Sequence, residues 1–192
     1  MNEASKAMRR RMEETRLGIF NWQDIFNGRG IDVGCGSDKI LYNTCIAFDM
    51  EHGDANYLSK YFTDRFDYLH ASQCLEHMYN PFEAILEWIK VVRKGGHLIV
   101  SIPDWDLYEG NKWPSRYNPD HKSTWSFTHE TSPAKYHVNI YKFLDYLKPH
   151  CYAKRTMLVD TNYDYSLGSN IDQTFIESNN AEAFIELVLC KT

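Results

Sequence analysis

The feature that most restricts the fold is a short apolar run that leads into a glycine turn. Residues 30–36 read Gly-Ile-Asp-Val-Gly-Cys-Gly, which predicts a buried strand followed by a turn at Gly34 and Gly36. Glycine lets the backbone approach a ligand where a Cβ would collide. Asp49 ends the next apolar run, and a carboxylate there can accept the hydroxyls of a ribose. This order is typical of nucleotide-binding α/β proteins.

Strands and helices continue to alternate after this motif. Phe66–Ala71 and His97–Ile102 are apolar runs that predict two further buried strands. Between them, Asn80–Lys94 has the period of a helix, with Asn80 as its cap and Gly95-Gly96 as its predicted end. Short strands that alternate with helices favour βαβ units and a mostly parallel sheet.

The N-terminal residues predict helices rather than strands. Residues 3–17 form a polar helix with a thin apolar stripe at Met8, Met12 and Leu17, and a second short helix is expected at Asn21–Phe26. The arginines at positions 9–11 have two interpretations. They could attract an anionic substrate, but the glutamates that follow favour a solvated helix face.

Residues 104–137 interrupt the alternation and predict a long ordered loop, which is usually a functional element. After it we expect a helix at Val138–Leu147 and strands at Arg155–Val159 and Ala183–Leu189. With 192 residues the chain fits one domain. We divide it into an N-terminal helical segment (1–28), a cofactor-binding half (29–103), a substrate-side insertion (104–137) and a C-terminal half (138–192).

Composition limits the partners and the compartment. A formal net charge of −5 argues against nucleic acid as a partner. The five cysteines are odd in number and lack C-x-x-C spacing, so we expect reduced thiols in a cytoplasmic protein. No apolar segment follows the basic start, and none is long enough to span a membrane, which predicts neither a secretory signal nor membrane insertion. The oligomeric state cannot be inferred from the sequence.

The glycine turn also bears on the kind of cofactor. A dinucleotide-binding fold usually has a third glycine where this chain has Lys39. This chain also has an acid, Asp32, two residues before the first glycine of the turn. Asp32-x-Gly34-x-Gly36 resembles the first motif of the class I S-adenosylmethionine-dependent methyltransferases. Further matches to that family follow in chain order, at residues 53–55, 66–72, 75–77 with 80–81, and 92–98.

The later matches indicate a branch of the family. Leu75-Glu76-His77, followed by Asn80-Pro81, is similar to a signature of the type 11 methyltransferases, and the resemblance extends over residues 30–105. Residues 113–118 and 120–122 resemble small bacterial methyltransferases that are often linked to surface-glycan biosynthesis. The resemblance implies a Rossmann-like α/β fold with a mostly parallel central sheet, an antiparallel last strand and helices on both faces.

The resemblance implies S-adenosyl-L-methionine as the cofactor, bound across the carboxyl ends of the strands. The residues expected to hold it lie in the glycine turn, after the second strand, near the adenine and beside the sulfonium: Asp32, Gly34, Cys35, Gly36, Asp49, Met50, Asp54, Ala55, Ser72 and Gln73. Asp49 could instead be an ordinary strand-end turn residue, and Asp54 and Ser72 have equally plausible structural roles.

The acceptor is expected to be a small molecule or a sugar or glycan precursor, methylated at oxygen. A hydroxyl has a high pKa, so its methylation calls for a general base, and His77 and His121 are the candidates. His77 could also make a structural hydrogen bond, and His121 could be a surface histidine. Lys112, Arg116 and Lys122 could pair with a phosphate or face solvent.

We expect no bound metal, although one interpretation of the insertion would allow a divalent ion. Its acidic and imidazole groups have no compact ligand spacing, so a solvated acidic loop is the preferred interpretation; they are Asp104, Asp106, Glu109, Asp120 and His121.

Aromatic residues make up 15% of the chain and are dense between Trp105 and Tyr165. That is where an acceptor pocket should lie, with aromatic rings available to stack on a sugar, although part of the excess must be core.

Other functions are compatible with parts of the pattern. A cofactor-binding module without catalysis, acting as the partner subunit of another enzyme, would keep the glycine turn. A nicotinamide-dependent dehydrogenase and an aminopropyl transferase share the fold class. The Asn/Asp-Pro-Pro-aromatic motif of enzymes that methylate the amines of nucleic-acid bases is absent after the fourth strand, which argues against DNA or RNA as the acceptor.

Overall fold

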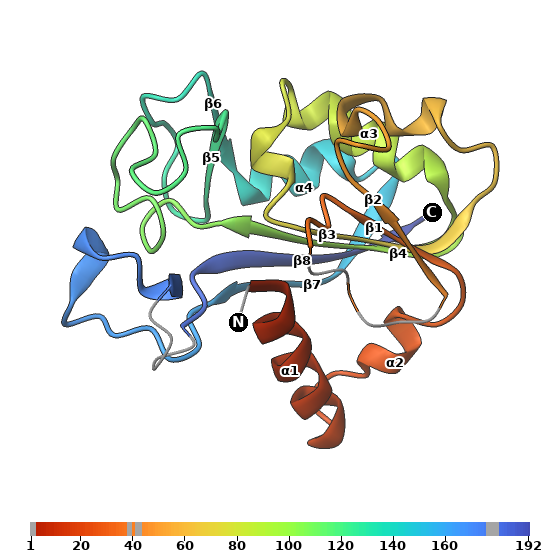
Figure 1. The fold of residues 1–192 in the computed structure, drawn as a ribbon, viewed down its shortest axis with the longest axis horizontal. Helices are drawn as coiled ribbons and strands as arrows, with labels where there is room; N and C mark the ends of the chain where they lie inside the picture. Colours follow the sequence, from red (N-terminus) through yellow and green to blue (C-terminus); the bar gives the residue numbers. More distant parts are fainter. Residues whose placement is uncertain (1–2, 38–39, 41–43, 176–180) are drawn as a thin grey trace.

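The computed structural model describes residues 3–37, 40, 44–175 and 181–192, and a mixed β-sheet is its central element (Figure 1). The six strands of this sheet lie in the order β2 (Cys45–Phe48), β1 (Gly30–Val33), β3 (Phe66–Ser72), β4 (Val92–Pro103), β8 (Phe184–Lys191) and β7 (Cys151–Val159). The first four are mutually parallel, and β8 is antiparallel to both of its neighbours. The expected mostly parallel sheet with an antiparallel last strand is confirmed.

Helices cover both faces of the sheet. In Figure 1, α1 (Glu3–Arg16) and α2 (Trp22–Ile25) lie below it, and α3 (Pro81–Val91) and α4 (Ile140–Leu147) lie above it. Short 3₁₀ turns complete the helical elements: η1 (Ala55–Lys60), η2 (Leu75–His77), η3 (Gly168–Asn170) and η4 (Gln173–Phe175). No helix among the described residues is long and apolar enough to cross a membrane. The five cysteines are free thiols, as expected.

The core lies mainly between the sheet and the α3–α4 layer. All four residues of β1 are buried, and so are Trp88 of α3 and Phe143 of α4. Trp125 is also fully buried and meets Phe143 edge-on at a ring-centroid distance of 5.0 Å. Part of the aromatic excess after residue 104 therefore belongs to the core.

The segment at 104–137 is more regular than a loop. Two short parallel strands, β5 (Ser123–Ser126) and β6 (Tyr136–Asn139), pair within and just beyond it. β6 takes the first residues of the predicted 138–147 helix, which begins at Ile140 because the Asn139 side chain accepts hydrogen bonds from the backbone of Tyr141 and Lys142. In Figure 1 this segment lies at the end of the sheet toward which β4 points.

Helix α3 is capped as predicted but ends earlier than expected. Asn80 accepts a hydrogen bond from the backbone of Phe82, and Pro81 occupies the first turn. The helix stops at Val91, not Lys94, because Val92 has extended dihedral angles and pairs with Phe66 in the sheet.

The glycine pair that was expected to end α3 lies inside β4 instead. A Cβ at Gly96 would come within 2.6 Å of the backbone oxygen of Asp67. Glycine is therefore needed there for the close approach of two strands and not for a helix cap.

The N-terminal helix corrects two expectations. Of the predicted apolar stripe, Met8 packs against buried residues, whereas Met12 and Leu17 are 67% and 56% exposed. The arginines are not a uniformly solvated face either. Arg9 is exposed, but Arg11 is fully buried and the side chain of Arg10 is only 11% exposed.

Charged side chains bind α1 to the sheet. Glu186, fully buried in β8, accepts hydrogen bonds from Arg11 at 2.6 Å and from Arg10 at 2.9 Å. Arg10 also pairs with Glu14 and Glu182 at 3.0 Å each. Burial alone would raise the pKa of the Glu186 carboxyl, but Arg11 and Arg10 overcome it and hold the pKa at about 2.

The first prediction concerns this buried ion pair. Glu186→Gln should lower the free energy of unfolding by about 3–5 kcal/mol, because it leaves buried arginine charge uncompensated. Urea unfolding followed by circular dichroism measures the change. Glu13→Gln, which breaks an exposed pair with Arg16, is the control and should have little effect. Equal stability of Glu186→Gln and the wild type would contradict the assigned role.

The same pair predicts a pH dependence. The folded-state pKa of Glu186 lies below its ordinary value of 4.5, so the stabilisation is present above that pH and is lost as the pH falls toward about 2. The stability difference between the wild type and Glu186→Gln should therefore shrink over that interval. A difference that stays constant between pH 5 and pH 2 would mean that the carboxylate does not carry the effect.

Candidate functional site

The glycine turn lies where the order of the parallel strands reverses. β1 is flanked by β2 on one side and β3 on the other, and such switch points bind ligands at the carboxyl ends of the strands. Gly34 and Gly36 both have positive φ angles, of 70° and 53°. A Cβ at Gly34 would come within 2.6 Å of Cys74 Sγ, so the turn packs directly on the loop after β3. Among the residues that the structure describes, no atom lies within 4 Å of a Cβ built at Gly36.

Asp32 is buried beneath the glycine turn. It is 2% exposed, and its Oδ2 accepts a hydrogen bond from the backbone of Ile40 at 2.9 Å. Its Oδ1 lies 2.6 Å from His70 Nδ1, and Arg11 lies 3.1 Å from the other ring nitrogen, Nε2. Because arginine can only donate, Nε2 is the acceptor and Nδ1 carries the proton. Asp32 thus ties the segment after the glycine turn to the buried charges under the sheet.

Asp49 is joined to the glycine turn at the end of β2. Its Oδ2 accepts a hydrogen bond from the backbone of Gly36 at 2.6 Å, and its Oδ1 accepts one from Met50 at 2.7 Å. The carboxylate is half-buried and has lone pairs left for hydroxyl donors. Met50 is 91% exposed. Cys35 is partly exposed, and burial followed by the charges of Asp32 and Asp49 raises the pKa of its thiol.

The residues expected near an adenine form a separate turn. Asp54 is exposed and caps η1 by accepting a hydrogen bond from Asn56 at 2.9 Å. The backbone oxygen of Ala55 accepts a hydrogen bond from the indole of Trp88, which fixes the turn to α3. This arrangement gives Asp54 a structural role and leaves its position open to a ligand.

The end of β3 holds an unsatisfied hydroxyl. Ser72 Oγ is buried and has no hydrogen-bond partner among the described residues. Its neighbour Gln73 has a positive φ of 53°, rare for a residue with a side chain, and its backbone donates to Ser101. A buried polar atom without a partner and a strained backbone are both typical of ligand sites.

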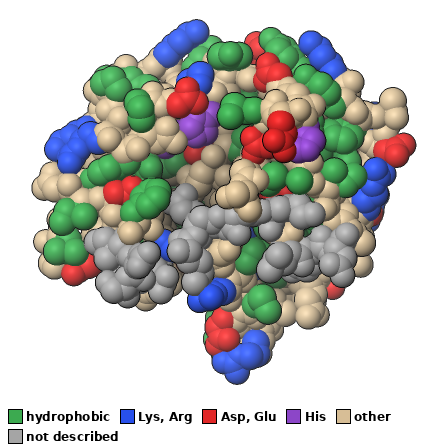
Figure 2. Space-filling view, in the orientation of Figure 1, with side chains coloured by type: hydrophobic (Ala, Val, Ile, Leu, Met, Phe, Trp, Pro, Cys, Tyr) green, Lys and Arg blue, Asp and Glu red, His purple; other side chains and the backbone are tan. Residues whose placement is uncertain are grey.

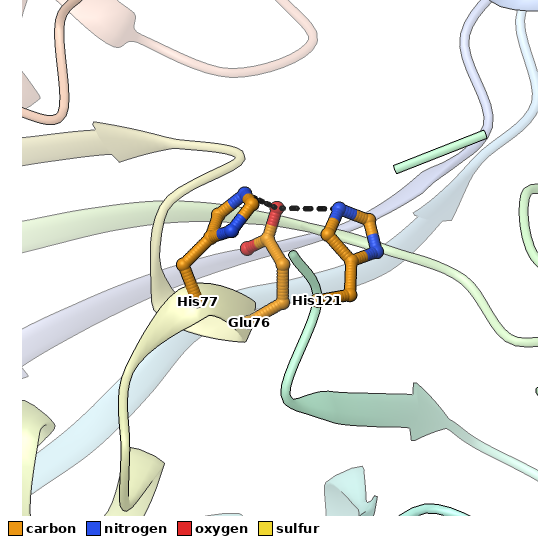
Figure 3. Close-up of side chains that lie close together, drawn as sticks. All are labelled: Glu76, His77 and His121. Carbon is orange, nitrogen blue, oxygen red and sulfur yellow. Dashed lines mark ion pairs between the residues drawn. The ribbon is translucent and has the colours of Figure 1, made fainter. Parts of the chain in front are cut away.

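Just beyond this point, two imidazoles converge on one carboxylate. Glu76 and His77 come from η2, His121 comes from the 104–137 segment, and both rings point toward the Glu76 carboxylate (Figure 3). The Nε2 atoms of His77 and His121 lie 3.9 Å and 3.8 Å from Glu76 Oε1. Glu76 is completely buried. In Figure 2, histidine and acidic side chains lie next to each other at two places in the upper part of the molecular face.

Each imidazole of the cluster is held from behind by a second carboxylate. Glu109 Oε1 lies 2.6 Å from His121 Nδ1, and Asp120 Oδ2 lies 3.0 Å from His77 Nδ1. The side chain of His121 is 2% exposed, whereas that of His77 is 22% exposed. Burial, followed by the charge of His121, lowers the pKa of His77. His77 is therefore the more accessible of the two candidate bases.

The acidic residues of the 104–137 segment do not form one ligand set. Asp104 accepts hydrogen bonds from the backbone of Asp106 and Leu107, and Asp106 contacts His129 at 2.9 Å. Glu109 and Asp120 support the two imidazoles described above.

All three cations considered for a phosphate have partners within the protein. Lys112 and Arg116 contact Asn170 in η3, and Lys122 pairs with Asp120 at 3.1 Å.

Three important residues were missed from the sequence. Glu76 was seen only as part of a motif, and Glu109 only as one acid among several. His70 lies in a strand, where its contact with Asp32 depends on the register of β1 against β3. The Glu76-His77 pair next to a strand end was the available signal. Lys39, which was considered for the choice of cofactor, lies outside the described residues.

Comparison with protein-family models matches residues 5–142 to a family described as "Methyltransferase domain". No curated protein has significant sequence similarity to the chain. Many solved structures share the fold.

One similar structure is a putative sarcosine dimethylglycine methyltransferase from Galdieria sulphuraria, with a TM-score of 0.57, 10% identity and coverage of 100% of this chain and 90% of that one. An S-adenosylmethionine-dependent methyltransferase from Mesorhizobium loti has a TM-score of 0.53 and 12% identity, with 88% and 93% of the two chains covered. A putative one from Listeria monocytogenes has a TM-score of 0.53 and 11% identity, with 99% and 100% covered. At these identities the likeness establishes the fold.

A prediction concerns Asp104, which stands where the 104–137 segment leaves β4. Burial raises the pKa of its carboxyl from the ordinary 3.8 to about 6. Hydrogen bonds from the backbone N–H groups of Leu107 and Asp106 lower the pKa, but their effect is smaller than that of burial. Its contribution to stability is therefore greatest below pH 3.8 and is lost as the pH rises through about 6. Asp104→Asn keeps an oxygen acceptor and should be more stable than the wild type at pH 8, by up to about 3 kcal/mol.

Urea unfolding at pH 8 and pH 4 tests this, and the gain should disappear at the lower pH. Asp145→Asn, which changes an exposed carboxylate of α4, is the control and should show no such gain. A loss of stability in Asp104→Asn at pH 8 would mean that the charged form is the one the fold requires.

Proposed function

We propose that this chain, which belongs to the methyltransferase domain family, uses S-adenosylmethionine as its methyl donor. From that premise we propose that it methylates a hydroxyl of a small, sugar-containing molecule, such as a glycan precursor. The observation that carries this proposal is the cluster of Glu76, His77 and His121 next to the cofactor end of β3. Methylation of a hydroxyl needs help with the departing proton, and this cluster stands where that help is required.

The cofactor is proposed to lie across the switch point of the sheet. Asp49 is held by the glycine turn through Gly36, in a position to accept the ribose hydroxyls. The methionine part would pass Gly34 and end beside Ser72, whose hydroxyl lacks a partner in the described structure. Asp54 lies farther along the same edge and would face the adenine, with Ala55 next to it.

The chemistry is an in-line displacement. The acceptor oxygen forms a bond to the methyl carbon with a lone pair, the carbon–sulfur bond breaks, and its electron pair stays on sulfur. The sulfonium thereby becomes a neutral thioether, and the hydroxyl proton passes to solvent water with the help of the cluster. The protein contributes mainly position and exclusion of water. His77 is the more exposed imidazole and is proposed to lie nearer the acceptor, with His121 behind it.

A sugar-containing acceptor is supported by the aromatic side chains around the cluster. Tyr108 lies 5.7 Å from the His121 ring and 5.6 Å from Tyr117, as measured between ring centroids. Tyr79, beside η2, is 65% exposed. Aromatic faces pack well against the C–H groups of a pyranose ring. The acidic net charge and the two supporting carboxylates disfavour a strongly anionic acceptor.

The cofactor part of the proposal predicts a loss of affinity in Asp49→Ala. Removing the carboxylate takes away the charged acceptor for the ribose hydroxyls, so the Kd for S-adenosylmethionine should rise about 10–100-fold, which corresponds to hydrogen bonds to a charged group. Isothermal titration calorimetry measures the Kd. Glu51→Ala removes an 80% exposed carboxylate two residues away and should leave it unchanged. Equal affinities of Asp49→Ala and the wild type would refute the assigned cofactor position.

The acceptor part is tested by methyl transfer from S-adenosylmethionine with a ¹³C-labelled methyl group. A panel of uncharged glycosides should yield O-methyl products, whereas matched amines should not react. Transfer to the amines alone would contradict O-methylation while leaving the cofactor assignment intact.

A further inference from the structure

The cluster of Glu76, His77 and His121 has the composition of a metal site. We propose that it binds one divalent transition-metal ion, such as Zn²⁺, Mn²⁺ or Fe²⁺, through His77 Nε2, His121 Nε2 and Glu76 Oε1. These three ligand atoms lie within 4.8 Å of one another (Figure 3). The proposal for the site rests on the geometry of this cluster, and only its use in catalysis rests on the proposed function.

The ligand set matches the preferences of such ions. Two imidazole nitrogens and one carboxylate oxygen are typical ligands of Zn²⁺ and of non-haem Fe²⁺. Three protein ligands also leave coordination positions open for water or a substrate oxygen. A structural zinc site, in contrast, would be closed by a fourth protein ligand.

Hydrogen bonds on the far side of each ring set the correct tautomer. Glu109 Oε1 lies 2.6 Å from His121 Nδ1, and Asp120 Oδ2 lies 3.0 Å from His77 Nδ1. A carboxylate accepts a hydrogen bond, so each Nδ1 carries the proton and each Nε2 keeps its lone pair. Metal-binding histidines are almost always oriented by such a partner.

A neighbouring amide is consistent with the same tautomer of His77. Asn118 Nδ2 lies 3.5 Å from His77 Nε2, and an amide nitrogen can only donate. This contact is at the limit of hydrogen-bond length, so a metal ion can displace it at little cost.

The distances require only a small contraction. At bond lengths of about 2.1 Å and angles of 90–109°, neighbouring ligand atoms are roughly 3.0–3.4 Å apart. The observed separations between Glu76 Oε1 and the two Nε2 atoms are 3.9 Å and 3.8 Å. Rotations of the side chains that move each atom by less than about 1 Å would complete the site. The ligands would then surround one common point.

The charges around the cluster favour a cation. The carboxylates of Glu76, Glu109 and Asp120 each lie beside an imidazole of the cluster. Lys122 pairs with Asp120 at 3.1 Å. Glu76 and Glu109 are 0% and 1% exposed. Carboxylates at such low exposure are costly unless a cation or a proton compensates them, and a divalent ion would do so.

The position of the site gives the ion a use in the proposed reaction. η2 follows β3 within a few residues of Ser72, where the sulfonium is proposed to lie. A hydroxyl bound at an open coordination position would lose its proton to solvent water more easily, because the ion stabilises the alkoxide. The alkoxide lone pair then forms the bond to the methyl carbon, and sulfur keeps the electrons of the broken bond.

The sequence did not predict this site, because its ligands are distant in the chain and the other acids of the 104–137 segment drew attention away from Glu76. We expected no metal, on the ground that the acids between Asp104 and Asp120 lack compact spacing. The structure assigns Asp120 and Glu109 to supporting positions. The proposed ligands are His121 and two adjacent residues of η2, which follows β3.

The experiment is a metal titration of the full-length chain after removal of bound metal with a chelator. Co²⁺ is the probe, followed by visible absorption, and Zn²⁺ is followed by calorimetry. We expect one ion per chain. His121→Ala and Glu76→Gln should each weaken binding by at least about 100-fold, since each removes a ligand. His150→Ala, at an exposed histidine after α4, should bind like the wild type.

Two further variants keep the test decisive if the buried substitutions unfold the chain. His77→Ala removes the most accessible ligand and should also abolish the Co²⁺ spectrum. Glu109→Gln keeps all three ligands and should weaken binding by about 10–100-fold through the loss of the oriented tautomer. Circular dichroism monitors the fold of each variant.

The proposal is overturned if the wild type shows no stoichiometric Co²⁺ or Zn²⁺ binding, or if a folded His77→Ala variant binds as the wild type does. The cluster would then be a set of imidazole–carboxylate pairs that share protons. Measuring S-adenosylmethionine binding to the metal-free protein separates the two proposals. The cofactor should still bind, because its proposed site at Asp49 does not include the ion. Metal binding without O-methylation of any hydroxyl acceptor would refute the proposed function and leave the metal site standing.

Discussion

A line of buried charged side chains connects the N-terminal helix with the cofactor edge of the sheet. Glu186 in β8 holds Arg11, Arg11 contacts His70 in β3 at 3.1 Å, and His70 contacts Asp32 in β1 at 2.6 Å. Asp32 in turn accepts a hydrogen bond from the backbone of Ile40 beyond the glycine turn. Each member needs its neighbour, because a buried charge without a partner is strongly unfavourable. The turn that is proposed to receive the cofactor is thus fixed from beneath the sheet.

Local sequence patterns predicted most of this fold. The strands β1 to β4 follow from apolar runs, and α3 follows from its period, its Asn80 cap and Pro81, because each of these signals acts within a few residues. The Arg10–Arg11 pair was misjudged for the opposite reason. Charged residues on a helix are usually solvated, and the burial of this pair is explained by Glu186 and Glu182, which lie far along the chain. Gly96 was misassigned because its need for close packing comes from Asp67 in another strand.

The candidate site likewise has a part that local patterns predicted and a part that depends on contacts between distant residues. Gly34, Gly36 and Asp49 were predicted from a strand–turn–strand order, and in the structure the backbone N–H of Gly36 donates to the Asp49 carboxylate at 2.6 Å. The acceptor side could not be assembled in this way. His121 lies near the Glu76 carboxylate because the segment after β4 folds back over η2. There the backbone N–H of Lys122 donates to the backbone oxygen of Glu76 at 2.8 Å. No local pattern encodes that contact, and the roles proposed for these residues depend on it.

Methyl transfer is proposed to take place at one edge of the sheet, between the glycine turn and the Glu76–His77–His121 cluster. A crystal structure of the chain with S-adenosylhomocysteine tests this most directly. We predict that the ribose hydroxyls lie within about 3.2 Å of the Asp49 carboxylate. The sulfur should lie beside Ser72 and face the cluster. A product bound away from Gly34 and Gly36, or with its sulfur directed toward Asp54, would contradict the account.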